Sequence, residues 1–68
     1  MKASEVRELT TDEMASRIDG LEEELFRLRF RRATMGDENP MLLRTIRRDI
    51  ARLKTILRER ELTSGGAR

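Results

Sequence analysis

Apolar residues recur at intervals of three and four along the second half of the chain. Five residues follow this spacing: Leu43, Ile46, Ile50, Leu53 and Leu57. The spacing places side chains on one stripe of an α-helix, and at about 100° per residue the five fall within an arc of roughly 80°. The pattern therefore predicts an amphipathic helix over residues 40–62, with one apolar side that needs a protein partner.

A second stripe of the same kind lies earlier in the chain. It is formed by Met14, Ile18, Leu21, Leu25 and Leu28, and three further residues are expected to widen it: Phe26, Phe30 and Ala33. Thr10 and Glu13 stand three apart, the capping-box spacing in which each side chain satisfies a free backbone N–H at a helix start. The pattern predicts a second helix over residues 11–34.

The segment between the two helices is short and rich in helix-ending residues. Gly36 suits the end of a helix, and Asn39 followed by Pro40 is a cap with proline at the first helical position. A loop of residues 35–39 is therefore expected. Because short links between helices make antiparallel neighbours, the two stripes can face each other in a hairpin.

The ends of the chain add little to this hairpin. Residues 2–9 predict a short helix, which is too short to be stable alone and must pack on the rest. Residues 63–68 are expected to be a flexible tail. The predicted fold is all-α: a single domain over residues 1–68, built as a long antiparallel two-helix hairpin, coiled-coil-like, with a short N-terminal helical turn.

Composition narrows the chemistry that the chain can perform. It has 68 residues, no cysteine and no histidine. Without cysteine it has no thiolate to bind a metal, and without histidine it lacks the commonest metal ligand and the commonest general base. The consecutive acids Glu22, Glu23 and Glu24 point about 100° apart on a helix and cannot share a metal. We expect no catalytic residues, no metal, no cofactor and no small-molecule substrate.

The N-terminal stretch is polar, and no run of residues approaches the ~20 apolar positions of a membrane span. The sequence therefore predicts a cytoplasmic protein without a membrane partner.

Charge is distributed unevenly along the chain. The formal net charge is only +2. Residues 1–25 carry three Lys or Arg against eight Asp or Glu, for a charge of −5, whereas residues 26–68 carry twelve against five, for +7. Such asymmetry indicates a nucleic-acid partner. The helix dipole also favours acids near a helix start and cations near its end, which gives part of the asymmetry a purely structural explanation.

The basic residues of the second helix gather beside its apolar stripe. They cover an arc of roughly 160° and comprise Arg44, Arg47, Arg48, Arg52, Lys54 and Arg58. Cations four residues apart repel each other, by about 0.2–0.5 kcal/mol per pair, so a helix that only needed solubility would more often alternate them with acids. Arginine also forms forked contacts with phosphate. An ordinary solvated face is the competing interpretation.

A further group of basic residues lies close to the loop and at the start of the chain. We predict that Arg27, Arg29, Arg31, Arg32 and Lys2 assist the basic helix in binding RNA. Phe26 and Phe30 could in principle stack on bases, but packing in the core or an interface is the favoured interpretation. The expected contacts are then made by Arg and Lys with phosphates and sugar hydroxyls of folded RNA.

Three segments of the chain resemble a known family. The run from Arg47 to Glu59, the segment Leu25 to Phe30 and the start Lys2 to Arg7 together closely resemble the bacterial large-subunit ribosomal protein family numbered twenty-nine. The resemblance covers nearly the whole chain. It implies a long α-hairpin bound to the large ribosomal RNA near the peptide exit tunnel. It also implies the ribosomal protein numbered twenty-three as a neighbour, and nearness to factors that meet nascent chains.

The chain departs from the family after Gly36, where Asp37 and Glu38 replace the usual Gln-Leu and remove an apolar contact. The leading hypothesis is a non-enzymatic structural ribosomal protein that binds large-subunit RNA. The alternative is a coiled-coil adaptor, in which the two stripes join a partner and the charges select it.

Overall fold

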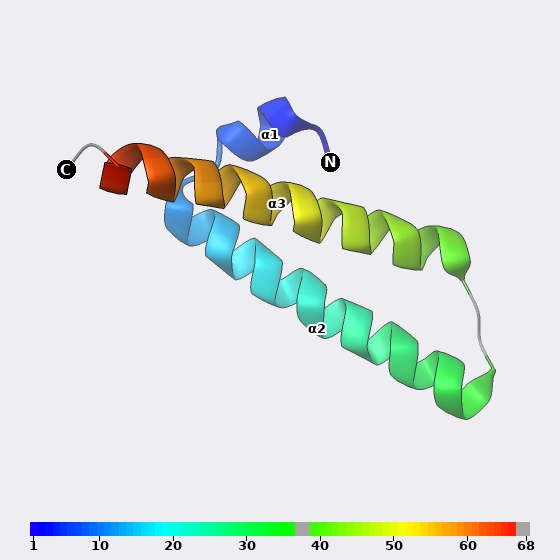
Figure 1. Ribbon diagram of the computed structural model, residues 1–68. Coiled ribbons are helices and arrows are strands. Elements are labelled where there is room, and N and C mark those ends of the chain that lie inside the picture. The colour runs from blue at the N-terminus through cyan, green and yellow to red at the C-terminus, as the bar shows by residue number, and fades with distance from the viewer. Residues whose placement is uncertain (37–38, 67–68) are drawn as a thin grey trace.

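The chain folds into three helices (Figure 1). They are α1 (Ala3–Arg7), α2 (Thr11–Met35) and α3 (Pro40–Gly66). The structure, a computed structural model, describes residues 1–36 and 39–66, without the side chains of residues 64–66. In the described ranges no strand is present and no helix is apolar enough over a sufficient length to cross a membrane. The fold is all-α, as predicted.

The helix bounds differ from the predicted ones mainly at the ends of α1 and α3. Residues 3–7 form α1, where 2–9 were expected, because the chain must turn at Glu8 and Leu9 to enter α2. The last helix continues to residue 66 instead of stopping at 62. Thr63 and Ser64 do not break a helix, and each added residue gains one backbone hydrogen bond. Of the expected tail 63–68, only residues 67–68 lie outside the described residues.

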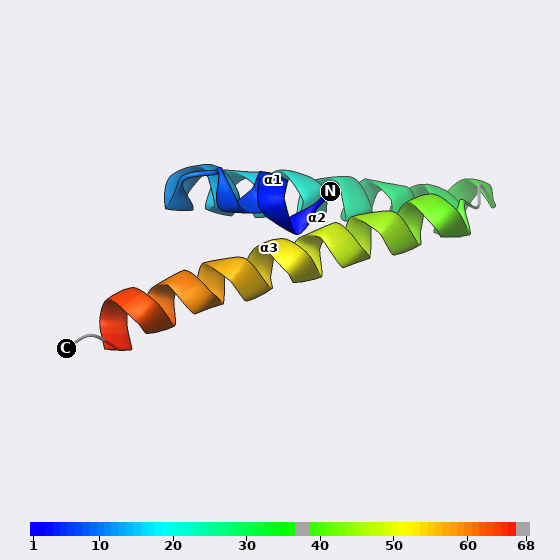
Figure 2. The ribbon, with the colours of Figure 1, turned by 90° about the horizontal axis from the view of Figure 1, so that it is seen from above.

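Helices α2 and α3 form an antiparallel hairpin (Figures 1 and 2). Their axes are inclined to each other in both views, and α1 lies beside the half of α3 that is far from the loop. The whole molecule is elongated, with principal extents of 50 × 19 × 15 Å. The loop end is therefore a two-helix structure, whereas the opposite end has three helices in contact.

The core lies where the three helices meet. A buried cluster there takes residues from every helix: Val6, Met14, Ile18, Leu53 and Ile56. Ile46 and Ile50 extend the buried stripe of α3 toward the loop. The two predicted stripes thus face each other, and the shared seam becomes less buried toward the loop, where Leu28 and Leu43 are only half-buried.

Local hydrogen bonds fix the predicted helix ends. At the start of α2, the Glu13 backbone N–H donates to Thr10 Oγ1 at 3.1 Å, and the Thr10 backbone N–H donates to Glu13 Oε1 at 2.8 Å. The second bond favours the charged carboxylate, so the Thr10 backbone N–H, and after it the Thr10 side chain, lower the pKa of Glu13 below its ordinary value. Gly36 ends α2 with φ 69°, and Asn39 Oδ1 accepts from the Leu42 N–H at 3.2 Å.

Three large apolar residues differ from the sequence-based prediction. Ile56, which lies outside the predicted stripe, is only 5% exposed. It is buried because α1 covers a second side of α3, roughly 120° around the helix from Ile50. Conversely, Phe26 and Phe30 do not widen the core stripe of α2, and that prediction is wrong. They lie roughly 80° and 120° around α2 from Ile18 and face solvent.

Candidate nucleic-acid interface

Four arginines of α3 lie on the surface that neither α1 nor α2 covers. Arg44, Arg47, Arg48 and Arg58 are exposed. Lys54 is also exposed and approaches α2, where its Nζ lies 3.3 Å from Glu22 Oε2. Exposed pairs of this kind contribute only about 0–1 kcal/mol, so the pair with Glu22 leaves Lys54 able to exchange its carboxylate partner for a phosphate.

A basic groove joins α2 and α3 near the loop. It is lined by Arg32 of α2 and by Pro40, Leu43, Arg44, Arg47 and Arg48 of α3. None of these lining residues is acidic. Arg32 continues the core stripe of α2 beyond Leu28, so the seam between the helices changes from apolar to basic as it approaches the loop. Four guanidinium groups from two helices thus share one concave surface.

Most of the other predicted basic residues lie outside this groove. Arg27, Arg29, Arg31 and Arg32 of α2 are all exposed, and Arg27 forms an exposed ion pair with Glu23, with Nη1 and Oε1 3.6 Å apart. Lys2 is exposed but lies before α1, at the three-helix end of the molecule. Of the predicted α2 arginines, Arg32 lines the groove with the α3 arginines. Arg27 and Arg31 line a separate hollow on α2, and Lys2 lies apart from both.

Arg52 has a different environment from the rest of the basic face. Its side chain is half-buried, and its Nη1 donates to the carbonyl oxygen of Met1. Asp49, one turn earlier, lies 3.4 Å from the amino nitrogen of Met1. Both residues point to the side of α3 that carries α1. Arg52 therefore helps to hold the N-terminal segment, a role that helical spacing on α3 alone does not reveal.

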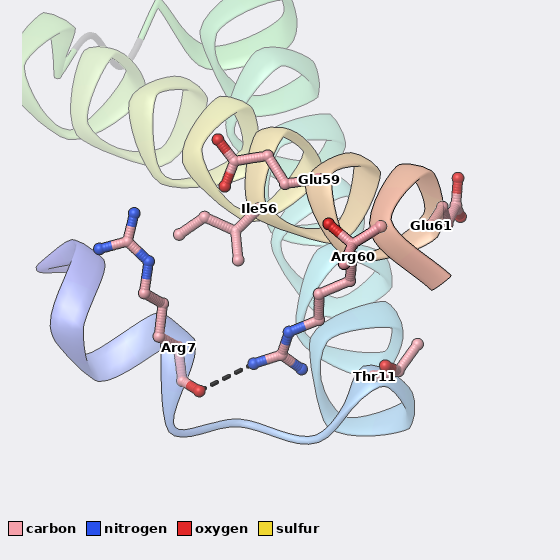
Figure 3. Close-up of a pocket in the computed structure, with 7 residues that line it drawn as sticks. Arg7, Thr11, Ile56, Glu59, Arg60 and Glu61 are labelled. Carbon is pink, nitrogen blue, oxygen red and sulfur yellow. Dashed lines mark hydrogen bonds between the residues drawn. The ribbon is translucent and has the colours of Figure 1, made fainter. Parts of the chain in front are cut away.

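Arg60 has a structural role that sequence reasoning missed. Its Nη1 donates to the carbonyl oxygen of Leu9 at 2.6 Å, and its Nη2 donates to that of Arg7 at 2.8 Å (Figure 3). Carbonyls at the end of a helix lack partners within the helix, and one guanidinium supplies two donors. In sequence, Arg60 looks like any other cation on a charged helix, so only the position of α1 identifies it.

The hollow beside Arg60 is not a second basic site. It lies between α1 and the last turns of α3 and is lined by Arg7, Thr11, Ile56, Glu59, Arg60, Glu61 and Thr63. Figure 3 shows the Arg60 side chain reaching across it toward the Arg7 carbonyl. Glu59 and Glu61 lie on its wall, and their carboxylates would repel an anion. The basic groove near the loop is therefore the better candidate for a polyanion.

Replacing Arg60 by methionine is expected to release α1 without disturbing the hairpin. Methionine keeps much of the apolar stem but donates no hydrogen bond, and bonds to charged donors contribute about 1.5–3 kcal/mol each. Amide hydrogen exchange should accelerate in residues 3–9 and stay unchanged near Ile46. Arg17→Met, on the exposed surface of α2, is the matched control. Equal protection of residues 3–9 in both variants would contradict the assigned role.

Comparison with known proteins identifies the family. The family described as "Ribosomal L29 protein" matches residues 4–60. The chain belongs to the ribosomal protein L29 family. Members of this family are structural, non-enzymatic proteins of the large ribosomal subunit, which confirms the resemblance inferred from the sequence. It also agrees with the expected location in the ribosome of the cytoplasm.

Individual relatives support the family assignment along nearly the whole chain. The chain is 61% identical over 62 residues to the large ribosomal subunit protein uL29 of Natranaerobius thermophilus, covering 91% of this chain and 95% of the relative. It is 59% identical over 66 residues to the protein of that name from Gemmatimonas aurantiaca, covering 97% and 98%. A third relative, from Moorella thermoacetica, is 58% identical over 62 residues, covering 91% and 92%.

Proposed function

We propose that this member of the L29 family binds large-subunit ribosomal RNA through the basic surface of α2 and α3. The observation that carries the proposal is the groove in which Arg32, Arg44, Arg47 and Arg48 come together from two helices. Folded RNA presents phosphates and sugar hydroxyls that such a surface recognises by charge and shape. Arg58, Lys54 and the α2 arginines extend the contact along the hairpin.

The shape of the hairpin supports this mode of binding. The molecule is 50 Å long and only 15–19 Å across, and the groove arginines lie near the loop end, beyond the three-helix core. A guanidinium donates two parallel hydrogen bonds to a phosphate. The repulsion among Arg44, Arg48 and Arg52 at four-residue spacing, which costs the isolated helix stability, is relieved when phosphates lie between them.

The position in the subunit follows from the resemblance to the family. We place the protein near the peptide exit tunnel, next to the ribosomal protein numbered twenty-three and within reach of nascent-chain factors. Asp37 and Glu38, which replace the Gln-Leu usual in the family, lie outside the described residues. Cross-linking of assembled subunits, followed by identification of the joined peptides, would test each of these neighbours.

A coiled-coil adaptor is disfavoured by the packing of the two stripes. Met14 and Ile18 of α2 pack with Leu53 of α3 inside one chain, so the apolar residues that a coiled-coil partner would need are already used. Sedimentation of the RNA-free protein distinguishes the two functions. We expect a monomer, whereas a stable dimer would favour the adaptor.

Binding to large-subunit RNA should depend steeply on salt. Each phosphate that a cation neutralises releases counterions and adds roughly −0.7 to −0.9 to the slope of log affinity against log salt. The four arginines of the groove alone predict a slope of about −3 to −4. A filter-binding titration from about 50 to 200 mM salt measures it. Small-subunit RNA is the control. A flat response, or equal affinity for both RNAs, would contradict the proposal.

A further inference from the structure

We propose that Phe26 and Phe30, with Arg27 and Arg31 beside them, form a stacking site for an unpaired RNA base. The inference rests on the proposed RNA binding and adds a second mode of recognition to it. The four residues line one shallow hollow on the outer side of α2. This hollow is separate from the arginine groove, which lies on the side of α2 that faces α3.

Both aromatic rings of the chain are exposed. The sequence contains two phenylalanines and no tyrosine or tryptophan, and Phe26 and Phe30 are 70% and 60% exposed. At a spacing of four residues they are neighbours on one helix surface. Because neither ring contributes to the core, core packing no longer competes with base stacking, and an interface with another protein is the remaining alternative.

The charges around the rings favour a nucleotide as the occupant. Residues 26–34 contain four arginines and no acidic residue. The ion pair between Arg27 and Glu23 is exposed, and exposed ion pairs contribute little to stability. A phosphate can therefore replace the Glu23 carboxylate as the partner of Arg27. Unpaired bases stack on aromatic rings and on guanidinium planes while their phosphates contact cations. A nucleotide thus satisfies the rings and the arginines together.

An apolar protein surface fits this hollow less well. Such a surface would cover Phe26 and Phe30 but would offer no anion to the arginines around them, whereas a nucleotide supplies a phosphate. The two rings form a small patch of one helical turn. The surface of the hollow is almost entirely apolar, which suits the face of a base, and the phosphate of that nucleotide would contact the arginines around it.

The groove and the stacking site lie close enough for one RNA molecule to contact both. At about 100° per residue, Arg32 faces the groove, Arg29 lies roughly 60° further around α2, and Phe26 roughly 60° beyond Arg29. Arg29 therefore stands between the two sites. A strand that leaves the groove can follow these side chains to the rings, where a base that is not paired in a helix would stack.

The test replaces both rings by leucine, in the double variant Phe26→Leu with Phe30→Leu, and uses a large-subunit RNA transcript as the probe. Leucine remains apolar but has no aromatic face. We expect affinity to fall roughly 5- to 150-fold for one stacked base. The salt slope should stay at the wild-type value, because no phosphate contact is removed. Circular dichroism checks that helicity is unchanged.

The matched control is Phe26→Tyr with Phe30→Tyr, which keeps both rings and should bind like the wild type. Ultraviolet irradiation of the wild-type complex should also join Phe26 or Phe30 to a nucleotide, located by mass spectrometry. Wild-type affinity of the leucine variant would overturn the stacking site and leave the arginine surface standing. If that variant instead binds RNA normally but loses a neighbouring ribosomal protein in assembled subunits, the patch belongs to that protein. Failure of the wild type itself to bind would overturn the proposed function.

Discussion

Replacing Arg44 and Arg48 together by glutamate is expected to weaken binding to large-subunit RNA by at least about 100-fold. Both residues line the groove and are exposed. Hydrogen bonds to charged groups contribute about 1.5–3 kcal/mol each, and about 1.4 kcal/mol corresponds to a factor of ten. Charge reversal also adds repulsion from phosphate. The slope of log affinity against log salt should become shallower by about 1.4 to 1.8, the contribution of two phosphate contacts.

The same double variant should keep its helicity or gain some. The substitution removes the repulsion between Arg48 and Arg52, which stand four residues apart on α3. A carboxylate introduced at position 48 stands four residues before Arg52, the favourable order for an ion pair. Loss of RNA binding in this variant therefore cannot come from loss of the helix, which circular dichroism would verify.

Arg7→Glu with Arg17→Glu is the control for net charge. It changes the net charge by the same amount, and both residues are exposed and lie outside the proposed surface. We expect its affinity for RNA to fall far less than that of the groove variant. Similar losses in the two variants would mean that overall charge, rather than the groove, determines binding, and would contradict the assigned surface.

Leu53→Ala should unfold the isolated chain. Leu53 is fully buried at the point where α1, α2 and α3 meet. Removing a buried leucine side chain costs about 2–5 kcal/mol, whereas a single core of this size rarely supplies more than about 3–5 kcal/mol. Thermal unfolding followed by circular dichroism should show little or no folded baseline for the variant.

Leu62→Ala on the same helix is the matched control, because Leu62 is 59% exposed. Its stability should stay within about 0.5 kcal/mol of the wild type. Saturating large-subunit RNA should restore much of the helicity of Leu53→Ala, since a ligand at 100 times its Kd adds about 2.7 kcal/mol. A Leu53→Ala chain as stable as Leu62→Ala would show that the three-helix cluster is not the main source of stability.

The hairpin could be predicted because its helices and their ends are determined by residues that are close together in the sequence. The stripes containing Ile18 and Leu53 repeat at the helical period, and Thr10, Gly36 and Asn39 each specify a helix end by their own hydrogen bonds or backbone angle. The position of α1 could not be predicted. Five helical residues match many surfaces, and the burial of Ile56 depends on which side of α3 they cover.

The candidate site was predictable as a set of cations but not as a surface. Arg44 and Arg48 are exposed, as their position on the helix predicts. Arg52 continues the same four-residue spacing but contacts Met1, because the N-terminal segment reaches that side of α3. The outward direction of Phe26 and Phe30 also escaped prediction, since an apolar ring beside a stripe is ordinarily assigned to the core.

The contacts of Arg60 with the Arg7 and Leu9 carbonyls join residues that are 53 and 51 positions apart. During synthesis residues 1–9 are made long before residue 60. Until residue 60 has left the ribosome, α1 lacks the Arg60 donors and the surface formed by Leu53 and Ile56, and only Met14 and Ile18 of its core neighbours are present. We therefore expect stable docking of the N-terminal segment to follow the synthesis of the last turns of α3.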